Sequence, residues 1–223
     1  MGYHVEQPFR IPATARDFEG FRRWARSKQF PQYGRIDYVD GDLEVDMSPE
    51  EIHTHSAVKA EIALKLLSRI VEPDLGMVHI ASTRITFPEA QLSTEPDLIV
   101  VLWDSLDKGR VREVPTKRNR PERSVELEGA ADLVVEVISD SSVGKDRTRL
   151  PPKYAAAGVP ELWLADVRRG LRFEVHVLGP EGYRLLAPDA DGWVRSPLLG
   201  LVHLRRERRR PDRWSYRLDV GED

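Results

Sequence analysis

Two short segments of this chain are apolar on both faces, and a carboxylate accompanies each of them. Residues 98–102 and 133–138 are almost unbroken runs of leucine, valine and isoleucine. A strand that is apolar on both pleat faces is typical of the centre of a sheet that is covered on both sides. Glu136 lies inside the second run, and Asp97 directly precedes the first, after Pro96. The two runs predict an α/β fold with a mixed central sheet flanked by helices.

Length and composition narrow the class of protein. The 223 residues suit one domain, with a core at about residues 35–167 and a β-rich C-terminal extension at about 168–220. The absence of cysteine excludes disulfides, thiolate metal sites and cysteine nucleophiles. No apolar run approaches the roughly 18–20 residues of a membrane-spanning helix, and the N-terminus lacks the apolar stretch of a signal peptide. We therefore expect a cytoplasmic protein with no membrane partner.

Hydrophobic periodicity and turn residues predict the secondary structure. The three-to-four-residue spacing of apolar residues favours helices at 15–28 and 49–71. A short helix is expected at 151–157; it cannot begin much earlier, because Pro151 and Pro152 are tolerated only in the first turn of a helix. Asp40-Gly41 predicts a hairpin turn, and 108–129 is polar enough to predict a loop or lid. Strands are expected at 35–39, 42–47, 82–87, 96–102, 132–139, 161–167, 173–178 and 183–187.

The two carboxylates are the candidates for chemistry. A lone charge at Glu136 would lose several kcal/mol of solvation unless a cation, a proton or hydrogen-bond donors compensate it. Two carboxylates at neighbouring strand ends can hold a hard divalent cation such as Mg²⁺. The alternatives are a structural ion pair for Glu136 and a turn or cap role for Asp97.

Further residues resemble a known family. They comprise Pro96-Asp97, Glu136, Asp146, Tyr154 and the run from Ala157-Gly158-Val159-Pro160-Glu161 to Leu162-Trp163-Leu164-Ala165-Asp166, with the Asp-Gly hairpin, Met47-Ser48-Pro49 and His55 in the N-terminal half. Over roughly residues 36–204 the chain resembles a bacterial restriction-endonuclease-like family of the PD-(D/E)-x-K nuclease superfamily. The resemblance implies a restriction-endonuclease-like fold and cleavage of phosphodiester bonds.

The same resemblance implies site residues. Asp97 and Glu136 would bind Mg²⁺ or Mn²⁺, and a lysine would orient the attacking water and stabilise developing charge. The superfamily places that lysine two residues after the glutamate, where this chain has Ile138. The family moves it to the position of Leu150. Lys145, expected in a loop near the end of the strand, is the preferred replacement. The alternatives are Lys153 or no lysine at all.

Accessory residues are open to two interpretations. His55 lies on the apolar stripe of its helix and either reaches the site or is a satisfied core histidine. Glu44 or Asp46 either adds a carboxylate to the metal or lies on a solvated strand face. Tyr154 and Trp163 are expected in the core. No phosphate-binding glycine loop, His-Glu-x-x-His motif or Gly-x-Ser-x-Gly elbow is present.

The leading hypothesis is a Mg²⁺- or Mn²⁺-dependent DNA endonuclease, with a homodimer expected by analogy with enzymes that cut both strands of a duplex. The net charge of −3 excludes a uniformly basic nucleic-acid coat protein. A second hypothesis is a binding or regulatory module on an inactive nuclease fold, which uses the arginine cluster at 205–210. A third is metal-dependent action on another substrate, such as RNA.

Overall fold

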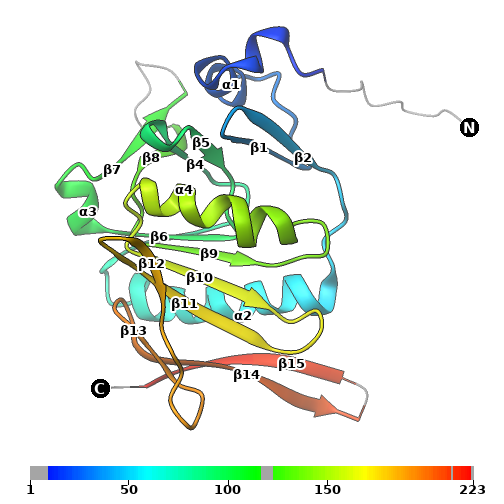
Figure 1. Ribbon diagram of the computed structural model, residues 1–223, viewed down its shortest axis with the longest axis vertical. Helices are drawn as coiled ribbons and strands as arrows, with labels where there is room; N and C mark the ends of the chain where they lie inside the picture. Colours follow the sequence, from blue (N-terminus) through cyan, green and yellow to red (C-terminus); the bar gives the residue numbers. More distant parts are fainter. Residues whose placement is uncertain (1–9, 117–122, 212, 222–223) are drawn as a thin grey trace, which may run out of the picture.

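The computed structural model describes residues 10–116, 123–211 and 213–221. Their strands form two six-stranded mixed sheets and one three-stranded sheet, with few helices (Figure 1). The predicted mixed α/β class with a β-rich C-terminal part is confirmed. The β-structure of the core is divided between two sheets, which we call sheets A and B, and the C-terminal sheet is sheet C.

The strands of each sheet are as follows. Sheet A has the order β2-β1-β5-β4-β8-β7, with β1 (Arg35–Val39), β2 (Asp42–Asp46), β4 (Arg84–Phe87), β5 (Leu92–Thr94), β7 (Val111–Pro115) and β8 (Ser124–Gly129). Sheet B has the order β12-β11-β10-β9-β6-β3, with β3 (Gly76–Ile80), β6 (Leu98–Leu102), β9 (Leu133–Val137), β10 (Glu161–Asp166), β11 (Arg172–Gly179) and β12 (Gly182–Leu185). Sheet C comprises β13 (Val194–Ser196), β14 (Gly200–Arg210) and β15 (Arg213–Gly221).

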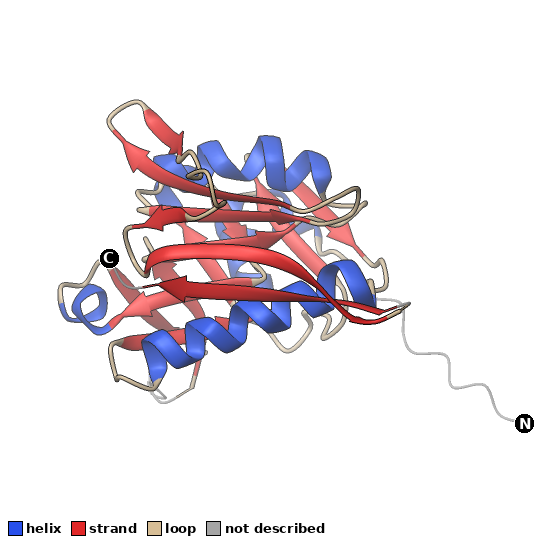
Figure 2. Ribbon diagram, turned by 90° about the horizontal axis from the view of Figure 1, so that it is seen from below, coloured by secondary structure: helices blue, strands red, loops and turns tan. Residues whose placement is uncertain are grey.

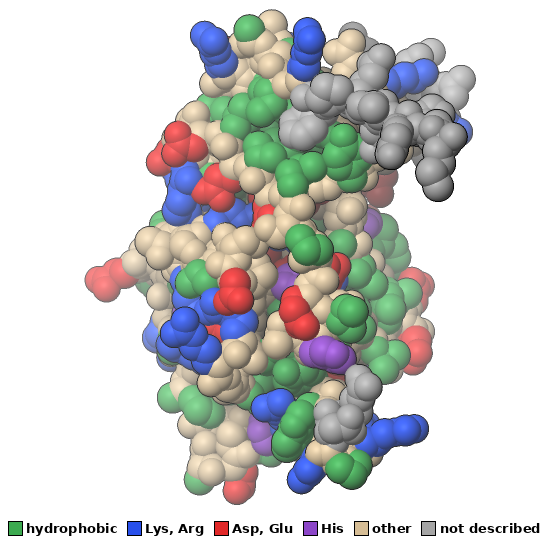
Figure 3. Space-filling model, turned by 90° about the vertical axis from the view of Figure 1, so that its right-hand side faces the viewer, with side chains coloured by type: hydrophobic (Ala, Val, Ile, Leu, Met, Phe, Trp, Pro, Cys, Tyr) green, Lys and Arg blue, Asp and Glu red, His purple; other side chains and the backbone are tan. Residues whose placement is uncertain are grey.

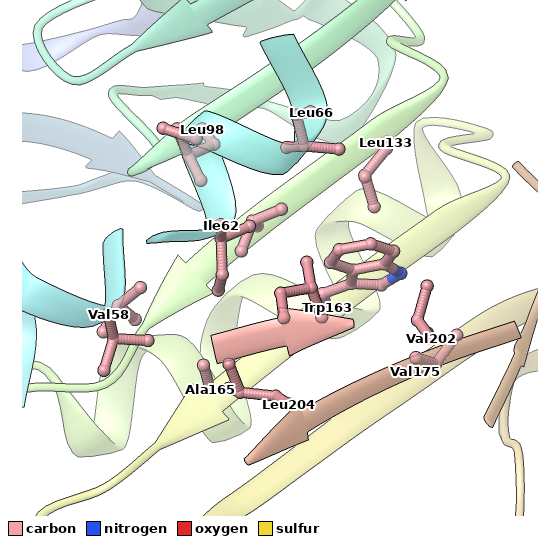
Figure 4. Packing of buried hydrophobic residues seen from close by; sticks show 14 of the residues in the cluster. Val58, Ile62, Leu66, Leu98, Leu133, Trp163, Ala165, Val175, Val202 and Leu204 are labelled. Carbon is pink, nitrogen blue, oxygen red and sulfur yellow. The ribbon is translucent and has the colours of Figure 1, made fainter. Parts of the chain in front are cut away.

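Two apolar runs occupy the middle of sheet B, as their composition predicted. β9 pairs with β6 on one side and with β10 on the other, antiparallel and parallel respectively. One hydrophobic cluster lies between sheet B, helix α2 (Ala57–Leu66) and sheet C, and includes Ile62, Leu98, Trp163 and Val202 (Figure 4). A second cluster lies on the opposite face of sheet B, against helix α4 (Leu150–Ala156) and sheet A. Both faces of β6 and β9 are therefore covered.

The long helix begins at Ile52, three residues later than the expected start at residue 49. Helical structure runs from η2 (Ile52–Ser56) through α2 to η3 (Leu67–Val71). Asp46 Oδ1 accepts the Ser48 backbone N–H at 2.8 Å, which holds this segment in a turn. Glu51 is the N-cap residue, and its side chain accepts the Thr54 N–H. α2 lies between sheets B and C (Figures 1 and 2), and these neighbours bury its apolar stripe of Val58, Ile62, Ala63 and Leu66.

The N-terminal segment and the first hairpin follow their local signals. Asp17 caps α1 (Phe18–Ala25), since its Oδ1 accepts the Gly20 N–H at 2.7 Å, and the short turn η1 (Ala13–Arg16) precedes it. The β1–β2 turn is confirmed, with φ of 56° at Asp40 and 91° at Gly41. The expected helix at 15–28 is thus interrupted by its own capping residue.

Two further expectations are wrong, and two strands were missed. The expected loop at 108–129 holds β7 and β8 after the short helix α3 (Trp103–Asp107); its residues 117–122 lie outside the described residues. These strands are partly exposed near the edge of sheet A, so they contain charged residues and lack the apolar pattern that predicts a strand. Neither β3 nor β5 was expected. The last helix begins before Pro151, because η5 (Lys145–Arg149) is a wider turn in which the Leu150 N–H donates to the Lys145 carbonyl.

Among the described residues, no helix is both long and apolar enough to cross a membrane.

Candidate functional site

Asp97 and Glu136 lie next to each other across two central strands. β6 and β9 pair with Leu98 opposite Val135, so the next position along the register sets Asp97 opposite Glu136. Opposed residues of an antiparallel pair project from the same face of the sheet. Both side chains are buried, and Asp97 Oδ2 accepts the Val137 N–H at 2.8 Å. The sheet register therefore brings together two carboxylates that are far apart in the sequence.

Cationic side chains surround Asp97. Arg35 Nη2, from β1, donates to Oδ1 at 3.0 Å. His55 Nε2 lies 3.3 Å from Oδ2, and Lys59 Nζ lies 3.8 Å from Oδ1. Burial opposes ionisation, but the hydrogen bond from His55 and the charge of Arg35 hold the pKa of Asp97 well below its usual range. Asp97 is therefore an anion in the folded protein.

His55 connects Asp97 to the surface. Its Nδ1 lies 2.9 Å from Glu50 Oε1, while its Nε2 faces Asp97. Burial lowers the pKa of the imidazole, but the two carboxylates outweigh that effect and raise it above the ordinary histidine value. His55 therefore positions and neutralises Asp97.

Glu136 has only half of its hydrogen-bonding capacity satisfied. Tyr154, on α4, donates its hydroxyl to Glu136 Oε1 at 2.6 Å. Oε2 is buried and has no hydrogen-bond partner among the described residues. Burial, followed by the charges of Asp146 and Asp97, raises the pKa of Glu136 well above its usual value. The ionised form of Glu136 is thus disfavoured unless a cation compensates its charge.

Asp146 is a third buried carboxylate of this cluster. It lies in the first turn of η5, and neither of its side-chain oxygens has a hydrogen-bond partner in the described part of the chain. Burial raises its pKa to about 6, against a reference value of 3.8; the charge of Lys145 and the nearby Ser142 hydroxyl oppose this shift, and the negative charge of Asp97 adds to it. Buried polar atoms are rarely left unpaired in native proteins, and an unplaced ion is one of the recognised explanations.

Lys145 belongs to the same cluster. Its Nζ lies 2.7 Å from Asp37 Oδ2, and Asp37 Oδ1 accepts the Glu95 backbone N–H at 3.0 Å. Both side chains of the Lys145–Asp37 pair are buried. Burial opposes the charge of the ammonium, but Asp37 and Asp146 raise the pKa of Lys145 above its ordinary value. Lys145 lies in a helical turn rather than in the expected loop, which fixes its direction.

The other candidate residues are engaged elsewhere. Lys153 Nζ lies 2.7 Å from Asp40, at the β1–β2 turn. Glu44 forms an ion pair with Arg149, and Asp46 Oδ2 accepts the Ser141 hydroxyl at 2.8 Å. The two positions at which the superfamily and the family carry the lysine, Ile138 and Leu150, are buried in the second hydrophobic cluster.

Two pockets that open to solvent adjoin the cluster, although Asp97, Glu136 and Asp146 line neither of them. Arg35, Asp37 and Lys145 line a pocket of about 420 Å³, together with Glu44 and Asp46. A neighbouring pocket of about 450 Å³ is lined by residues that include Arg35, Glu50, His55, Lys59 and Arg168. Arg35 lines both pockets. In Figure 3, which faces the side of the molecule where α2 begins, acidic, basic and histidine side chains gather at mid-height.

The carboxylates are suitable donors for a divalent cation once Arg35 moves away from Asp97. Among the described residues, no three or more His, Asp or Glu side chains are grouped closely enough to hold an ion as they stand. Arg35 already donates to Asp97, and its charge also interacts with Glu136, Asp37 and Asp146. Mg²⁺ commonly binds through only one or two carboxylates and retains several waters. Asp97 and the unpaired oxygens of Glu136 and Asp146 are the residues that could hold it.

Sequence reasoning missed Arg35, Asp37 and Lys59. Arg35 and Asp37 have a signal in the sequence, because they alternate with Ile36 and Tyr38 and so share one face of β1. Lys59 follows His55 by four residues on the same helix face, and this spacing indicates a shared neighbour.

A comparison with models of protein families identifies the family of the chain. Residues 18–207 match the model described as "Uma2: Putative restriction endonuclease". The chain belongs to the Uma2 family. The comparison with curated proteins found no match.

A solved structure shares the fold of this Uma2 chain. It is described as a putative nuclease belonging to DUF820, from Anabaena variabilis ATCC 29413. The two chains are 20% identical, with a TM-score of 0.57, and the match covers 81% of this chain and 89% of the other. The family and the fold that the sequence resembles are thereby confirmed, and they support a nuclease-like role for this Uma2 member.

Proposed function

We propose that this chain is a divalent-metal-dependent endonuclease that hydrolyses DNA phosphodiester bonds. One observation carries the proposal: Glu136 Oε2 and both oxygens of Asp146 are buried beside Asp97 and have no hydrogen-bond partner among the described residues. Asp97 and Asp146 raise the pKa of Glu136, and Asp97 raises that of Asp146, so the cations of the cluster compensate these two buried carboxylates incompletely. Asp97, Glu136 and Asp146 are the proposed metal ligands, and membership of a family described as putative restriction endonucleases supports this proposal.

Each residue of the cluster has a role in this proposal. When bound, Mg²⁺ or Mn²⁺ polarises the scissile phosphate and lowers the pKa of a bound water. Lys145 stabilises the charge that develops on the phosphate, because its ammonium is held at the cluster by Asp37. Arg35 lines both pockets and attracts the phosphate to the cluster. His55 positions Asp97, and Tyr154 orients Glu136.

A DNA cleavage assay tests this function. Purified protein is incubated with supercoiled plasmid, single-stranded DNA or RNA, in Mg²⁺, Mn²⁺ or EDTA. We expect nicking of DNA in either metal and none in EDTA. Cleavage of RNA but not DNA would identify RNA as the substrate. Binding without cleavage in every metal would favour the inactive binding module. The Arg35–Asp97 ion pair, which already neutralises one proposed ligand, is the observation that favours that second function.

The raised pKa of Asp146 predicts how stability changes with pH. Because folding raises this pKa from 3.8 to about 6, the folded state binds more protons than the unfolded state between these values. The contribution of Asp146 to the free energy of unfolding therefore falls as pH rises through this window. We expect Asp146→Asn to raise the melting temperature of the metal-free protein at pH 7.5 by several degrees, and to change it little at pH 4. This follows from about 1.4 kcal/mol per pKa unit.

Metal addition supplies the matching control for Asp146. At pH 7.5 we expect Mn²⁺ to raise the melting temperature of the wild type more than that of Asp146→Asn, because only the wild type presents this ligand. At pH 5 the metal must displace a proton, so the wild-type increase becomes smaller. Equal increases for both proteins at pH 7.5 would remove Asp146 from the proposed ligands.

A further inference from the structure

The hairpin formed by β14 and β15 has two faces of different chemistry. The strands pair with Leu204 opposite Leu218 and with Arg208 opposite Trp214. Leu204 and Leu218 are buried in the cluster that packs on α2. Residues two apart on a strand share a face. Arg206, Arg208 and Trp214 therefore continue the α2-facing side of the hairpin toward its tip, and we call these three residues the inner face.

The opposite face of the hairpin is neutralised by its own ion pairs. Arg205 pairs with Glu207 and Asp219, with its Nε 2.5 Å from Asp219 Oδ2. Arg209 Nη2 lies 2.9 Å from Glu207 Oε2, and Arg217 Nε lies 2.9 Å from Asp219 Oδ1. Three arginines thus share two carboxylates, and this outer face is a typical solvated surface.

The inner face has no such compensation. The Arg206 guanidinium carbon lies 4.2 Å from the centroid of the Trp214 ring, and that of Arg208 lies 5.8 Å from it. Arg208 also donates its Nε to the Pro211 carbonyl at 3.1 Å. Within the described part of the chain, no carboxylate lies within ion-pair distance of either arginine. Trp214 is 46% exposed, which is unusual for the largest apolar side chain.

The inner face lies on the same side of the molecule as the carboxylate cluster. In Figure 1 the tip of the hairpin, the start of the helix that carries His55 and the end of β9 all lie on the right. Figure 3 shows that side of the molecule, and basic side chains lie in the lower part of the view. Tyr216, which lies opposite Arg206 in the hairpin, is near enough to Glu51 for their charges to interact, and Glu51 lines the pocket that also contains His55.

We propose that the inner face binds the phosphate backbone of a nucleic acid strand that continues from the carboxylate cluster, with Trp214 as a stacking platform for a base. Arginines that have no carboxylate partner among the described residues can bind phosphates, and an exposed aromatic ring beside them can bind unpaired bases without sequence preference. The choice of DNA as the strand rests on the proposed function; the surface itself rests on the geometry of the hairpin.

Fluorescence anisotropy with labelled single-stranded DNA tests this surface, using the full wild-type chain in EDTA so that no metal-dependent cleavage occurs. The variant Arg206→Gln/Arg208→Gln is compared with Arg205→Gln/Arg209→Gln, which changes the net charge by the same amount on the outer face. We expect at least a tenfold loss of affinity for the inner-face variant and at most about a twofold loss for the outer-face variant. The slope of log Kd against log salt should fall by about 1.4 for the inner-face variant, since each lost phosphate contact on a single strand changes it by about 0.7.

Further readouts separate the possible causes of a change in binding. Trp214→Leu should weaken binding to single-stranded DNA more than to duplex, because stacking needs unpaired bases. Melting temperatures within a few degrees of wild type establish that each variant is folded. Equal losses for the two double variants, no DNA binding by the wild type, or equal competition by polyglutamate would each overturn the proposal. Loss of binding in the inner-face variant supports the surface even if no metal gives cleavage, so the two proposals fail separately.

Discussion

Glu136→Gln is expected to reduce metal-dependent DNA cleavage by a thousandfold or more while the protein stays folded. The amide oxygen can still accept the Tyr154 hydroxyl, which is 2.6 Å from Oε1 in the wild type. The substitution replaces a carboxyl group, whose ionised form burial and two neighbouring carboxylates disfavour, with a neutral amide, so the metal-free protein should be at least as stable as the wild type at pH 7.5. The amide cannot supply the anionic ligand that a divalent cation requires.

Glu161→Gln is the matched control. Glu161 is equally buried and lies on β10, the neighbouring parallel strand. Its carboxylate accepts the Trp163 Nε1–H at 2.6 Å and the Leu198 N–H at 3.1 Å, so its contacts are structural. We expect this variant to be less stable than wild type but to cleave DNA at a similar rate in Mn²⁺. Comparable activity of Glu136→Gln and wild type in a plasmid-nicking time course would contradict the proposed centre.

Lys145→Met has the second large expected effect, on both stability and activity. It removes the ammonium 2.7 Å from Asp37 Oδ2 and leaves a buried carboxylate without its nearest cation. Breaking one side of a buried ion pair typically costs about 3–5 kcal/mol. Arg35 and Arg84 also lower the pKa of Asp37, so we expect the lower end of that range. Urea denaturation monitored by tryptophan fluorescence measures this change.

Two further variants separate the structural and the catalytic contributions of Lys145. Lys153→Met, on the same helical segment, loses only the partly exposed pair with Asp40 and should change stability by less than about 1 kcal/mol. The double variant Lys145→Met/Asp37→Leu removes both members of the buried pair and should recover most of the lost stability. We expect it to remain inactive in Mg²⁺ and Mn²⁺. Recovery of cleavage in the double variant would show that Lys145 acts only by stabilising the fold.

Local patterns predicted the elements that are most apolar or most strongly signalled. The runs at 98–102 and 133–138 form β6 and β9, with Ile138 just beyond the end of β9, because their side chains are compatible only with burial on both faces. Asp40-Gly41 forms the expected hairpin turn, since this turn requires a positive φ at both positions and Asp and Gly tolerate it. The same logic failed for β7, because a partly exposed strand near a sheet edge tolerates charged residues such as Arg112 and Glu113.

The sequence by itself determined which carboxylates belong to the centre of the fold. Asp97 and Glu136 lie in or beside segments that have to be buried, so each of them requires a compensating group however the rest of the chain is arranged. Which groups lie beside them depends on long-range contacts. Arg35 reaches Asp97 across 62 residues of sequence.

Only the tertiary structure distinguished the surroundings of the two candidate lysines. Lys145 and Lys153 lie eight residues apart on one helical segment, with similar local chemistry. The docking of that segment against the β1–β2 hairpin directs Lys145 to the buried Asp37 and Lys153 to the exposed Asp40. This difference arises from the packing of elements more than 100 residues apart, which no local pattern of residues encodes.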